Sequence, residues 1–535
     1  MSANLPDIND EIARIREKNP GLSENKIEIL EVRKKFSDCI LWKMIEDFYK
    51  QAGPKAWEAI PYYATSNPSI AETYASCIIA YLLDIAPSLG KHTPVYIVEL
   101  GAGQSLFCYY LLKELVEKRE SFECLRGIQV RYVATDFADN NVESWERCKE
   151  LQPFLTSGLL DFAVFDPEKD SMLQLKRSGE SLVPGSSNCH IIATANYFFD
   201  TIRQDFFHVD NGVLREGRVT FYREASNPGV APRFDEVRKI DSYIDVNPDY
   251  YNNPNFNAIL DSYLKDVDQA SILFPVGALK CIEKLEAISG GNFALLVSDK
   301  GFCNKNNLLG LREVSFEPMH ECTSFMVNFD ALARYFELRG GYAFIPSESN
   351  ALNTGMYISP QNPARKFEHT RYFANSTLMK KVSVHALANM PILARRANLD
   401  DANAELKFRV CMSVMQLSNY DPMTFAACGA ILSEIYSELR PDQKRQLKFA
   451  LFCVEANFHP RVPGIEFAAN WARALYSAMG MYDACLSNAR QALDRNEDNG
   501  HALYYMGTCL EYKGQRKAAL DCFKKAGTLA EPTTQ

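Results

Sequence analysis

The sequence predicts a doubly wound α/β domain followed by an all-helical region. Short β-rich runs alternate with helical stretches through the middle of the chain, which is typical of a parallel sheet covered by helices. The runs 95–100 and 293–299 are almost continuously apolar, as strands buried on both faces must be. From about residue 386 to the end, the pattern is helical throughout.

Composition is that of a globular protein. The chain has 535 residues, of which 47% are hydrophobic and 23% charged, which argues against wholesale disorder and suggests about three or four folding units. The net charge of −9 argues against a general nucleic-acid binder, which needs a basic surface to displace phosphate counterions. The 15 cysteines lack the spacing of a zinc site, so we expect reduced thiols and no metal.

The sequence shows no sign of export or of a membrane span. The most apolar run, 77–86, is short for a bilayer and contains Asp84. The N-terminal residues include Asp7 and Asp10 and lack the apolar stretch of a secretory signal. We therefore expect a cytoplasmic protein that does not contact membranes, of unspecified oligomeric state.

Four regions are expected along the chain. Their bounds are 1–60 for charged helices, 61–350 for the α/β domain, 351–385 for a polar linker or lid, and 386–535 for a helical domain. Strands are predicted at 95–100, 130–136, 159–166, 190–196 and 293–299, and a hairpin inserted within 206–222 turns at Asn211-Gly212. The Pro- and Asn-rich stretch 225–260 is expected to be irregular.

The helical domain contains a 34-residue repeat. Gly480 and Gly514 are one period apart, as are Ala492 and Ala526. The period predicts helix–turn–helix units, and the last unit resembles a tetratricopeptide repeat (TPR). Stacks of such units form extended concave surfaces, so we expect this TPR-like region to bind a protein partner. The alternative is that these helices pack on the rest of the chain and bind nothing.

The strongest chemical signal follows the first strand of the sheet. Glu99 ends the strand, and Gly101 and Gly103 form a turn before a helix. Glycines let the chain turn tightly and let a ligand approach the backbone. A dinucleotide would need a third glycine where this chain has Leu106. S-adenosyl-L-methionine has no phosphate, and an acid at the strand end suits its amino group and sulfonium. The alternative is a plain strand–turn–helix connection.

Polar side chains also end the next three strands. Asp136 follows the second strand, where a carboxylate can accept hydrogen bonds from both hydroxyls of a ribose. Asp166 follows the third and would meet an adenine amino group. The fourth runs into Asn196-Tyr197-Phe198-Phe199-Asp200, at the edge where α/β sheets bind ligands. For this last segment the alternative is a core role for the aromatic rings and a helix cap for Asp200.

Together these motifs resemble the MidA-like family of S-adenosylmethionine-dependent methyltransferases, which includes the mitochondrial complex I assembly methyltransferase. The similarity runs from about Tyr62 to Ile345 and rests on the order of segments 68–70, 98–103, 195–200, 293–301 and 323–332. It implies a Rossmann-like class I methyltransferase fold, with a mostly parallel seven-stranded sheet and an inserted hairpin. It also implies methyl transfer to a protein side chain, which is arginine in the characterised branch.

The resemblance assigns roles to individual residues. The cofactor would contact Glu99, Gly101, Gly103, Asp136 and Asp166, and the reacting centre would be faced by Asn196, Tyr197 and Asp200. Any general base would be Asp200, with Tyr197 beside it.

One departure from the family favours a rival function. Tyr197 stands where the family has Glu, and a carboxylate pair would hold a guanidinium better than one carboxylate does. The rival is a non-catalytic methyltransferase-like scaffold that binds a protein partner through its helical C-terminus. An NAD-dependent oxidoreductase is disfavoured by Leu106.

Overall fold

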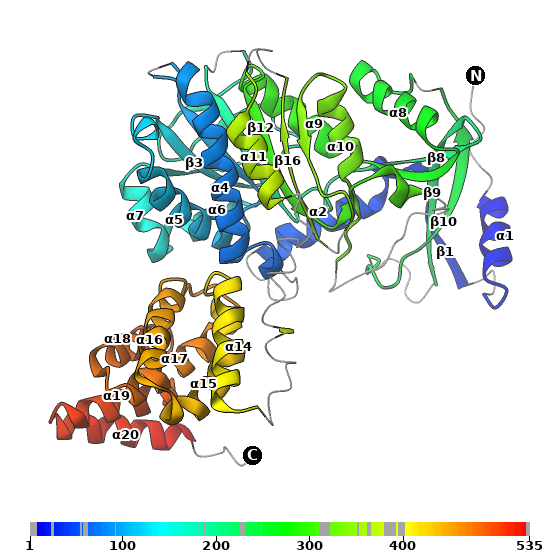
Figure 1. The fold of residues 1–535 in the computed structure, drawn as a ribbon. Helices are drawn as coiled ribbons and strands as arrows, with labels where there is room; N and C mark the ends of the chain where they lie inside the picture. The colour runs from blue at the N-terminus through cyan, green and yellow to red at the C-terminus, as the bar shows by residue number, and fades with distance from the viewer. Residues whose placement is uncertain are drawn as a thin grey trace. The chain divides into compact units, whose positions relative to one another are not determined.

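A mixed sheet of seven strands organises the α/β part of the computed structural model (Figure 1). Its order is β15-β16-β12-β7-β2-β3-β4. The parallel strands are β2 (Val95–Leu100), β3 (Val130–Asp136), β4 (Leu160–Val164), β7 (His190–Asn196) and β12 (Phe293–Asp299). The strand β16 (Asn353–Ile358) is antiparallel to β12 and to β15 (Tyr342–Phe344). The predicted seven-stranded, mostly parallel sheet is confirmed, and all five predicted strands are present.

The structure describes residues 8–22, 26–53, 56, 62–90, 92–185, 188–224, 231–247, 249–309, 322–349, 352–360, 365–378, 392–393 and 402–530. The chain divides into two compact units. The first comprises residues 1–65 and 73–385, and the second comprises 66–72 and 386–535.

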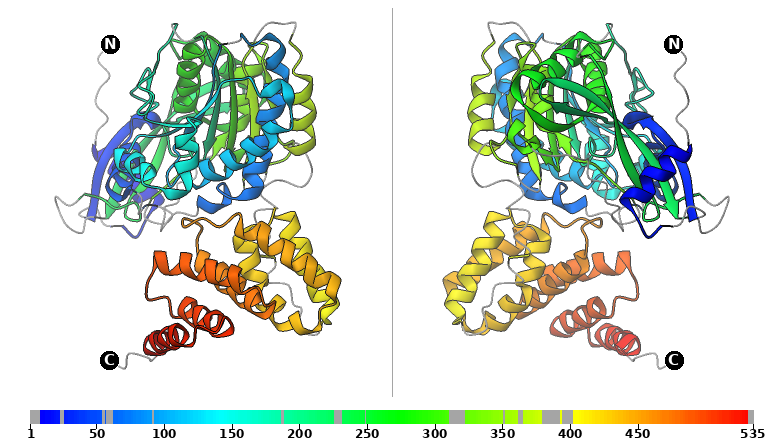
Figure 2. Two further views of the ribbon diagram at one scale, coloured as in Figure 1. Left: turned by 90° about the vertical axis from the view of Figure 1, so that its left-hand side faces the viewer. Right: turned by 90° about the vertical axis from the view of Figure 1, so that its right-hand side faces the viewer.

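The seven-stranded sheet grows in two directions from its centre. From β2 the chain adds β3 and β4 on one side, and it then returns to add β7 and β12 on the other. Helices cover both faces of the sheet (Figure 2). Such a reversal leaves a crevice at the carboxyl ends of the two central strands, where open α/β sheets bind ligands. In this chain the crevice lies between the ends of β2 and β7.

Alternation along β2 separates the two faces of the sheet. Val98 and Leu100 share one core with the buried side chains of α8 (Pro254–Asp266), α9 (Val276–Ile288) and α10 (Phe329–Glu337). Because successive side chains of a strand point to opposite faces, Glu99 points to the other face.

A second sheet, which is antiparallel, has five strands. They are β1 (Ile27–Lys35), β8 (Asp205–Asp210), β9 (Val213–Glu224), β10 (Arg238–Asp245) and β11 (Gln269–Phe274). The predicted hairpin is β8–β9, and its turn residues Asn211 and Gly212 have φ of 50° and 78°, as a two-residue hairpin turn requires. The insertion is therefore confirmed, within a larger sheet than the sequence predicted.

The prediction of helices throughout 1–60 is wrong for β1, although α1 (Ile8–Lys18) and α2 (Ile40–Ala52) are helical. Residues 27–35 pair with β9, and this pairing outweighs the helical spacing of the apolar residues around them. The expectation of an irregular 225–260 is likewise wrong, because this stretch contains β10 and the start of α8.

The prediction of a linker or lid over 351–385 is wrong for its described parts. All six residues of β16 are buried inside the sheet, and α11 (Glu368–Thr377) follows. The polar side chains of β16 find partners there: Asn353 Nδ2 donates to Gly301 O at 3.0 Å, and Thr354 Oγ1 lies 2.6 Å from Ser298 Oγ. Residues 361–364 and 379–385 lie outside the described residues.

The second unit is helical, as predicted. Its helices are α14 (Ala404–Leu417), α15 (Pro422–Ile435), α16 (Pro441–Glu455), α17 (Ile465–Ala478), α18 (Tyr482–Arg495), α19 (Gly500–Tyr512) and α20 (Arg516–Ala530). Gly480 and Gly514 form equivalent turns with φ of 71° and 77°. Gly507 allows close crossing, because a Cβ there would lie 2.7 Å from the Phe523 ring. The 34-residue period is thus present as two helix pairs, while their assignment to the tetratricopeptide family stays a prediction.

One apolar stretch is longer than the sequence analysis expected. Residues Pro68–Ser88, which include α4 (Pro68–Ile85), are long and apolar enough to cross a membrane by length and composition. About two thirds of this stretch, 67%, is buried inside the protein, and core helices pass the same test.

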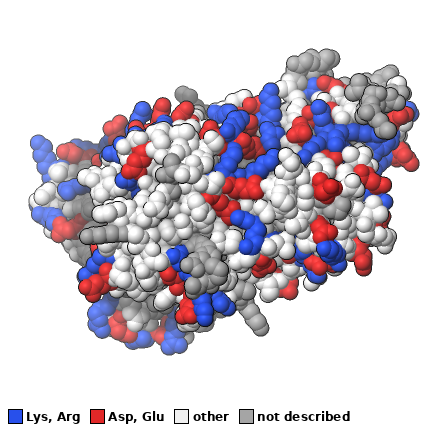
Figure 3. All heavy atoms as spheres, turned by 90° about the horizontal axis from the view of Figure 1, so that it is seen from above, with Lys and Arg blue, Asp and Glu red and all other residues white. Residues whose placement is uncertain are grey.

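The surface carries charges of both signs. On the face drawn in Figure 3, Lys and Arg residues lie among Asp and Glu residues. Neighbouring charges of opposite sign weaken the long-range field of a surface.

Candidate functional site

The turn after β2 is bonded to the end of β3. The backbone N–H of Ala102 donates to Thr135 O at 2.8 Å, and that of Gly103 donates to Asp136 Oδ2 at 3.2 Å. Gly101 and Gly103 have φ of 65° and 52°, a region that glycine adopts at little cost. The sequence folds this way locally because glycines occupy two of the three left-handed positions of the turn, the third being Ser105 with φ of 58°, and because an acid lies at the end of the adjacent strand.

The Asp136 carboxylate collects several donors at this point. Its Oδ1 accepts from Ala138 N at 3.0 Å, and its Oδ2 accepts from Asn141 Nδ2 at 3.0 Å as well as from Gly103. Burial raises the pKa of Asp136, and these hydrogen bonds oppose the rise. Asn141 Oδ1 is buried with no hydrogen-bond partner among the described residues. An unpaired acceptor and a carboxylate with spare lone pairs therefore lie side by side.

A cavity opens at this position. Five segments line it: α2, the turn after β2, and the segments that follow β3, β4 and β7. The lining residues are Trp42, Ile45, Glu46, Tyr49, Gly101, Asp136, Phe137, Asn141, Asp166, Pro167, Glu168, Tyr197, Phe198, Thr201, Ile202 and Arg203. The cavity lies at the crevice between β2 and β7 that the sheet topology singles out.

One wall of the cavity comes from α2, which the sequence analysis placed in a separate N-terminal region. Trp42 and Ile45 belong to a core shared with the second sheet, and Trp42 Nε1 donates to Phe36 O at 2.6 Å. Trp42 and Tyr49 are seven residues apart and lie on one helix face. That spacing is visible in the sequence, but nothing in the sequence says which surface the face covers.

Ion pairs join α2 to the loops around the cavity. Lys169 Nζ lies 2.6 Å from Glu46 Oε1 and 2.8 Å from Asp166 Oδ2. Arg203 Nε donates to Glu168 Oε2 at 3.0 Å, and its Nη1 donates to Ser37 O at 2.9 Å. Exposed pairs of this kind contribute little stability individually. Their effect here is to position α2 against the loops after β4 and β7.

The structure brings together three of the five predicted cofactor residues. Gly101, Asp136 and Asp166 line the cavity, while Glu99 and Gly103 do not. Glu99 points to the far face of the sheet and accepts from Tyr132 OH at 2.9 Å. Burial, and then the charge of Asp136, raise the pKa of Glu99 to about 8 despite that bond. Gly103 contributes its backbone bond to Asp136 instead.

Of the three residues predicted at the reacting centre, only Tyr197 lines the cavity. Its φ is 46°, a left-handed conformation that costs free energy for a residue with a side chain and is often found at functional sites. Asn196 uses both ends of its amide inside the protein: Tyr74 OH donates to Oδ1 at 2.7 Å, and Nδ2 donates to Thr65 O at 3.2 Å. Asn196 therefore orients the chain through both ends of its amide.

Asp200 lies buried beside a second acid, Asp299, which the sequence analysis did not count among the site residues. The Asp200 N–H donates to Asp299 Oδ2 at 3.2 Å, and Asp200 Oδ1 is buried with no partner among the described residues. Burial raises the pKa of Asp200 to about 6, while the charge of Lys300 opposes the rise. Burial and then the charge of Asp200 raise the pKa of Asp299 well above its usual value. The two carboxyls thus titrate as a pair, and both of their pKa values are raised.

The acid pair lies close behind the cavity wall. After burial, the charges of Asp299 and Asp200 are the main causes that raise the pKa of Tyr197. Both acids also help to raise the pKa of Tyr49, which burial dominates. The one sequence signal for Asp299 was its place at the end of a predicted strand, the same signal that selected Asp136.

A pH-dependent stability test concerns Glu99. The folded pKa of about 8 exceeds the unfolded value of about 4.3, so the folded protein binds this proton more tightly. The contribution of Glu99 to the free energy of unfolding is fully present below about pH 4. It is lost as the pH rises to 8, by up to about 1.4 kcal/mol per pH unit. Glu99→Gln keeps an acceptor for Tyr132 and does not titrate. Its stability relative to wild type should therefore rise from pH 5 to pH 8 and then level off, as measured by urea unfolding. If the unfolding free energies of the wild type and the variant depended on pH in the same way, the pKa of Glu99 would not be raised in the folded protein.

A second test concerns Gly101. A Cβ at this position would lie 2.7 Å from Phe198 Cδ2, whereas one at Gly158, with a similar φ of 74°, meets nothing within 4 Å. Gly158→Ala should cost only the strain of a positive φ, about 1 kcal/mol. Gly101→Ala should cost about 1–3 kcal/mol more in urea unfolding, because of overpacking against the ring. The addition of Phe198→Ala should reduce this additional loss of stability. If Gly101→Ala and Gly158→Ala lost the same stability, the Phe198 ring would be able to move away from the new Cβ at no cost.

Comparisons with known proteins give similarity only to solved structures. No family model matches the chain, and no curated protein matches it. An uncharacterised protein from Burkholderia thailandensis aligns at 11% identity with a TM-score of 0.37, over 68% of this chain and 97% of its own. A member of the same superfamily from that organism, crystallised with S-adenosyl-homocysteine, aligns at 13% identity with a TM-score of 0.34, over 72% of this chain and 93% of its own. Scores this low carry no functional conclusion, so the function must be inferred from the residues of this chain.

Proposed function

We propose that this chain binds S-adenosyl-L-methionine in the cavity between β2 and β7 and transfers the methyl group to a protein side chain. By family resemblance the acceptor is arginine. The observation that carries the proposal is the pair of acceptors, Asp136 and Asn141 Oδ1, beside a glycine turn at the reversal point of a parallel sheet.

The cavity residues fit the three parts of this cofactor. Two ribose hydroxyls match the Asp136 carboxylate and the unpaired Asn141 Oδ1. Phe137 and Pro167 offer apolar surface to a purine beside Asp166. The aromatic rings of Tyr197 and Phe198 suit a positively charged sulfur. When bound, S-adenosylmethionine supplies a sulfonium methyl group that is open to direct displacement.

The protein's own contribution to transfer is alignment and removal of a proton. Side chains from several segments hold their positions through core packing, which favours alignment of an acceptor with the methyl group. The Asp200–Asp299 pair takes the proton that an acceptor releases, and a pKa of about 6 leaves Asp200 ionised at neutral pH. Because Asp200 does not line the cavity, Tyr197 is the residue through which the pair meets the acceptor. The helical C-terminal region would recognise the protein that carries the acceptor.

A scaffold without catalysis is the second candidate. It is favoured by two observations: Tyr197 replaces a carboxylate of the family motif, and neither Asp200 nor Asn196 lines the cavity. The two candidates agree on partner binding and differ in methyl transfer.

Cofactor binding tests the proposal directly. Calorimetry with S-adenosylmethionine and S-adenosyl-homocysteine should show one site per chain. Asp136→Asn should weaken both ligands by about 10- to 100-fold, since a hydrogen bond to a charged group contributes about 1.5–3 kcal/mol. Asp139→Asn is the matched control, because this neighbouring side chain is exposed, and it should leave affinity unchanged. Failure of wild type to bind either ligand would contradict the proposal.

Catalysis is tested separately from binding. Asp200→Asn should reduce transfer of labelled methyl groups to proteins in a lysate at least about 100-fold and leave cofactor affinity within a few fold. Asp210→Asn, on the β8–β9 hairpin and partly exposed, should behave as wild type. Full transfer by Asp200→Asn would remove Asp200 from the mechanism. Cofactor binding without any transfer by wild type would favour the scaffold.

A further inference from the structure

The last helix leaves apolar surface exposed where the preceding helix pair is covered. The helices α18 and α20 begin 34 residues apart, at Tyr482 and Arg516, after equivalent glycine turns. Leu486 of α18 is 5% exposed, whereas Leu520, 34 residues later, is 52% exposed. The difference arises because α19 packs against α18, while α20 is the last described helix and no described helix follows it. Among the described residues, α20 therefore has an open face.

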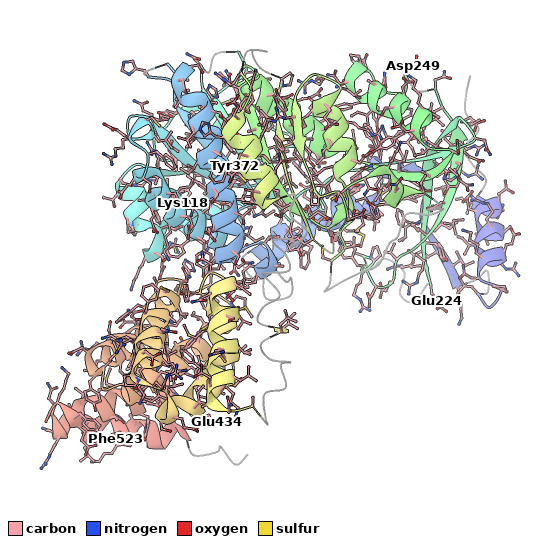
Figure 4. All side chains as sticks on the ribbon, viewed as in Figure 1. Lys118, Glu224, Asp249, Tyr372, Glu434 and Phe523 are labelled. Carbon is pink, nitrogen blue, oxygen red and sulfur yellow. The ribbon has the colours of Figure 1, made fainter. Side chains whose placement is uncertain are left out.

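We call this open face the α19–α20 face: Tyr504 and Leu520, which are exposed, and Phe523, which is half-buried. Leu520 and Phe523 are three residues apart and adjoin each other on α20. The Phe523 ring lies 5.9 Å from that of Tyr504 on α19, and the Tyr504 side chain is itself exposed. Figure 4 marks the position of Phe523 on α20.

Positive charge surrounds the patch. Three basic residues share the side of the helix on which Leu520 lies. Arg516 is four residues before Leu520, Lys517 is three residues before it, and Lys524 is four residues after it. None of the three has an ion-pair partner in the described part of the chain. Asp521 is the only acid in α20, against four basic residues. This is a local excess of positive charge in a chain whose net charge is −9.

The shape and the charge of the face select its occupant. In the preceding pair, Leu486 is buried on a helix that packs against both α17 and α19, so the equivalent surface around Leu520 fits a helix as well. If two copies of the chain associated through this face, two basic α20 helices would lie against each other and repel. Insertion into a membrane needs a wide apolar stripe, but Ala519 and Ala526 of α20 are already buried.

We infer that the α19–α20 face binds an amphipathic helix of a protein partner whose apolar residues are flanked by Asp and Glu. The inference goes beyond the proposed methyl transfer and does not depend on it. Apolar contacts with Tyr504, Leu520 and Phe523 provide affinity, and the basic rim selects acidic partners and sets their orientation.

The test uses the full chain and two synthetic helical peptides of about 18 residues, long enough for five turns. Both carry Leu at helical spacing, flanked by Glu in one peptide and by Lys in the other. Fluorescence anisotropy should show saturable binding of the Glu peptide, weakened by salt, and binding of the Lys peptide at least about tenfold weaker. Leu520→Ser, and separately Lys517→Glu with Lys524→Glu, should each weaken the Glu peptide about tenfold, or 1.4 kcal/mol. Leu417→Ser, at an exposed leucine of α14, should change nothing.

Several outcomes would overturn the inference. Circular dichroism melting first establishes that the variants fold. Absence of binding by the Glu peptide, equal binding of both peptides, or binding that Leu520→Ser leaves intact would each contradict it. Self-association in sedimentation that Leu520→Ser abolishes would assign the face to a second copy. Binding to vesicles of anionic phospholipid that the same variant abolishes would assign it to a membrane.

Discussion

The candidate site depends on one buried carboxylate. Asp136 accepts hydrogen bonds from the backbone of Gly103 and Ala138 and from the side chain of Asn141, so it joins the turn after β2 to the start of α6 (Asp139–Glu146). Trp145 Nε1 of α6 donates a hydrogen bond to Gly103 O at 2.8 Å. Burying a charge is costly unless it is well bonded, and the pKa of Asp136 is raised by that cost. The same arrangement leaves Asn141 Oδ1 without a partner among the described residues, beside the Asp136 carboxylate at the edge of the cavity, so the group that supports this turn is also the one to which the proposed cofactor would bind.

The second sheet matters because it holds α2 in place. Phe206 and Phe221 of the β8–β9 hairpin belong to the core that buries Trp42 and Ile45, and both of these α2 residues also line the cavity. A loosely held α2 would leave the ends of β2 and β7 open to water. The insertion into the α/β domain thus supports one wall of the cavity, while the other lining residues follow the strands of the parallel sheet.

Much of this architecture was predictable because local sequence dictates it. The strands 95–100, 130–136, 190–196 and 293–299 were predicted at their observed bounds, since long apolar runs have few alternatives to a buried parallel strand. Asp136 and Asp166 followed from their places at strand ends. The strand β16 was missed because its polar residues find partners only inside the sheet, and α2 was missed as a cavity wall because long-range packing decides what a helix covers. The acid pair was missed for the same reason, because Asp200 and Asp299 come from strands far apart in the sequence.

The acid pair and Tyr197 should be considered together. A carboxylate at position 197, as in the family motif, would bring a third acid to a place where burial already raises the pKa of both Asp200 and Asp299. Mutual repulsion would then leave more of these groups protonated. A phenol avoids that repulsion and still presents a polar hydroxyl to the cavity. The backbone of Tyr197 is left-handed, and Tyr197 N donates a hydrogen bond to Ser298 O at 3.0 Å. This conformation costs free energy, and such strain is often found at residues that have a function. Tyrosine at this position is therefore compatible with the proposed methyl transfer, in which the acids would bind the proton and the phenol would make the contact.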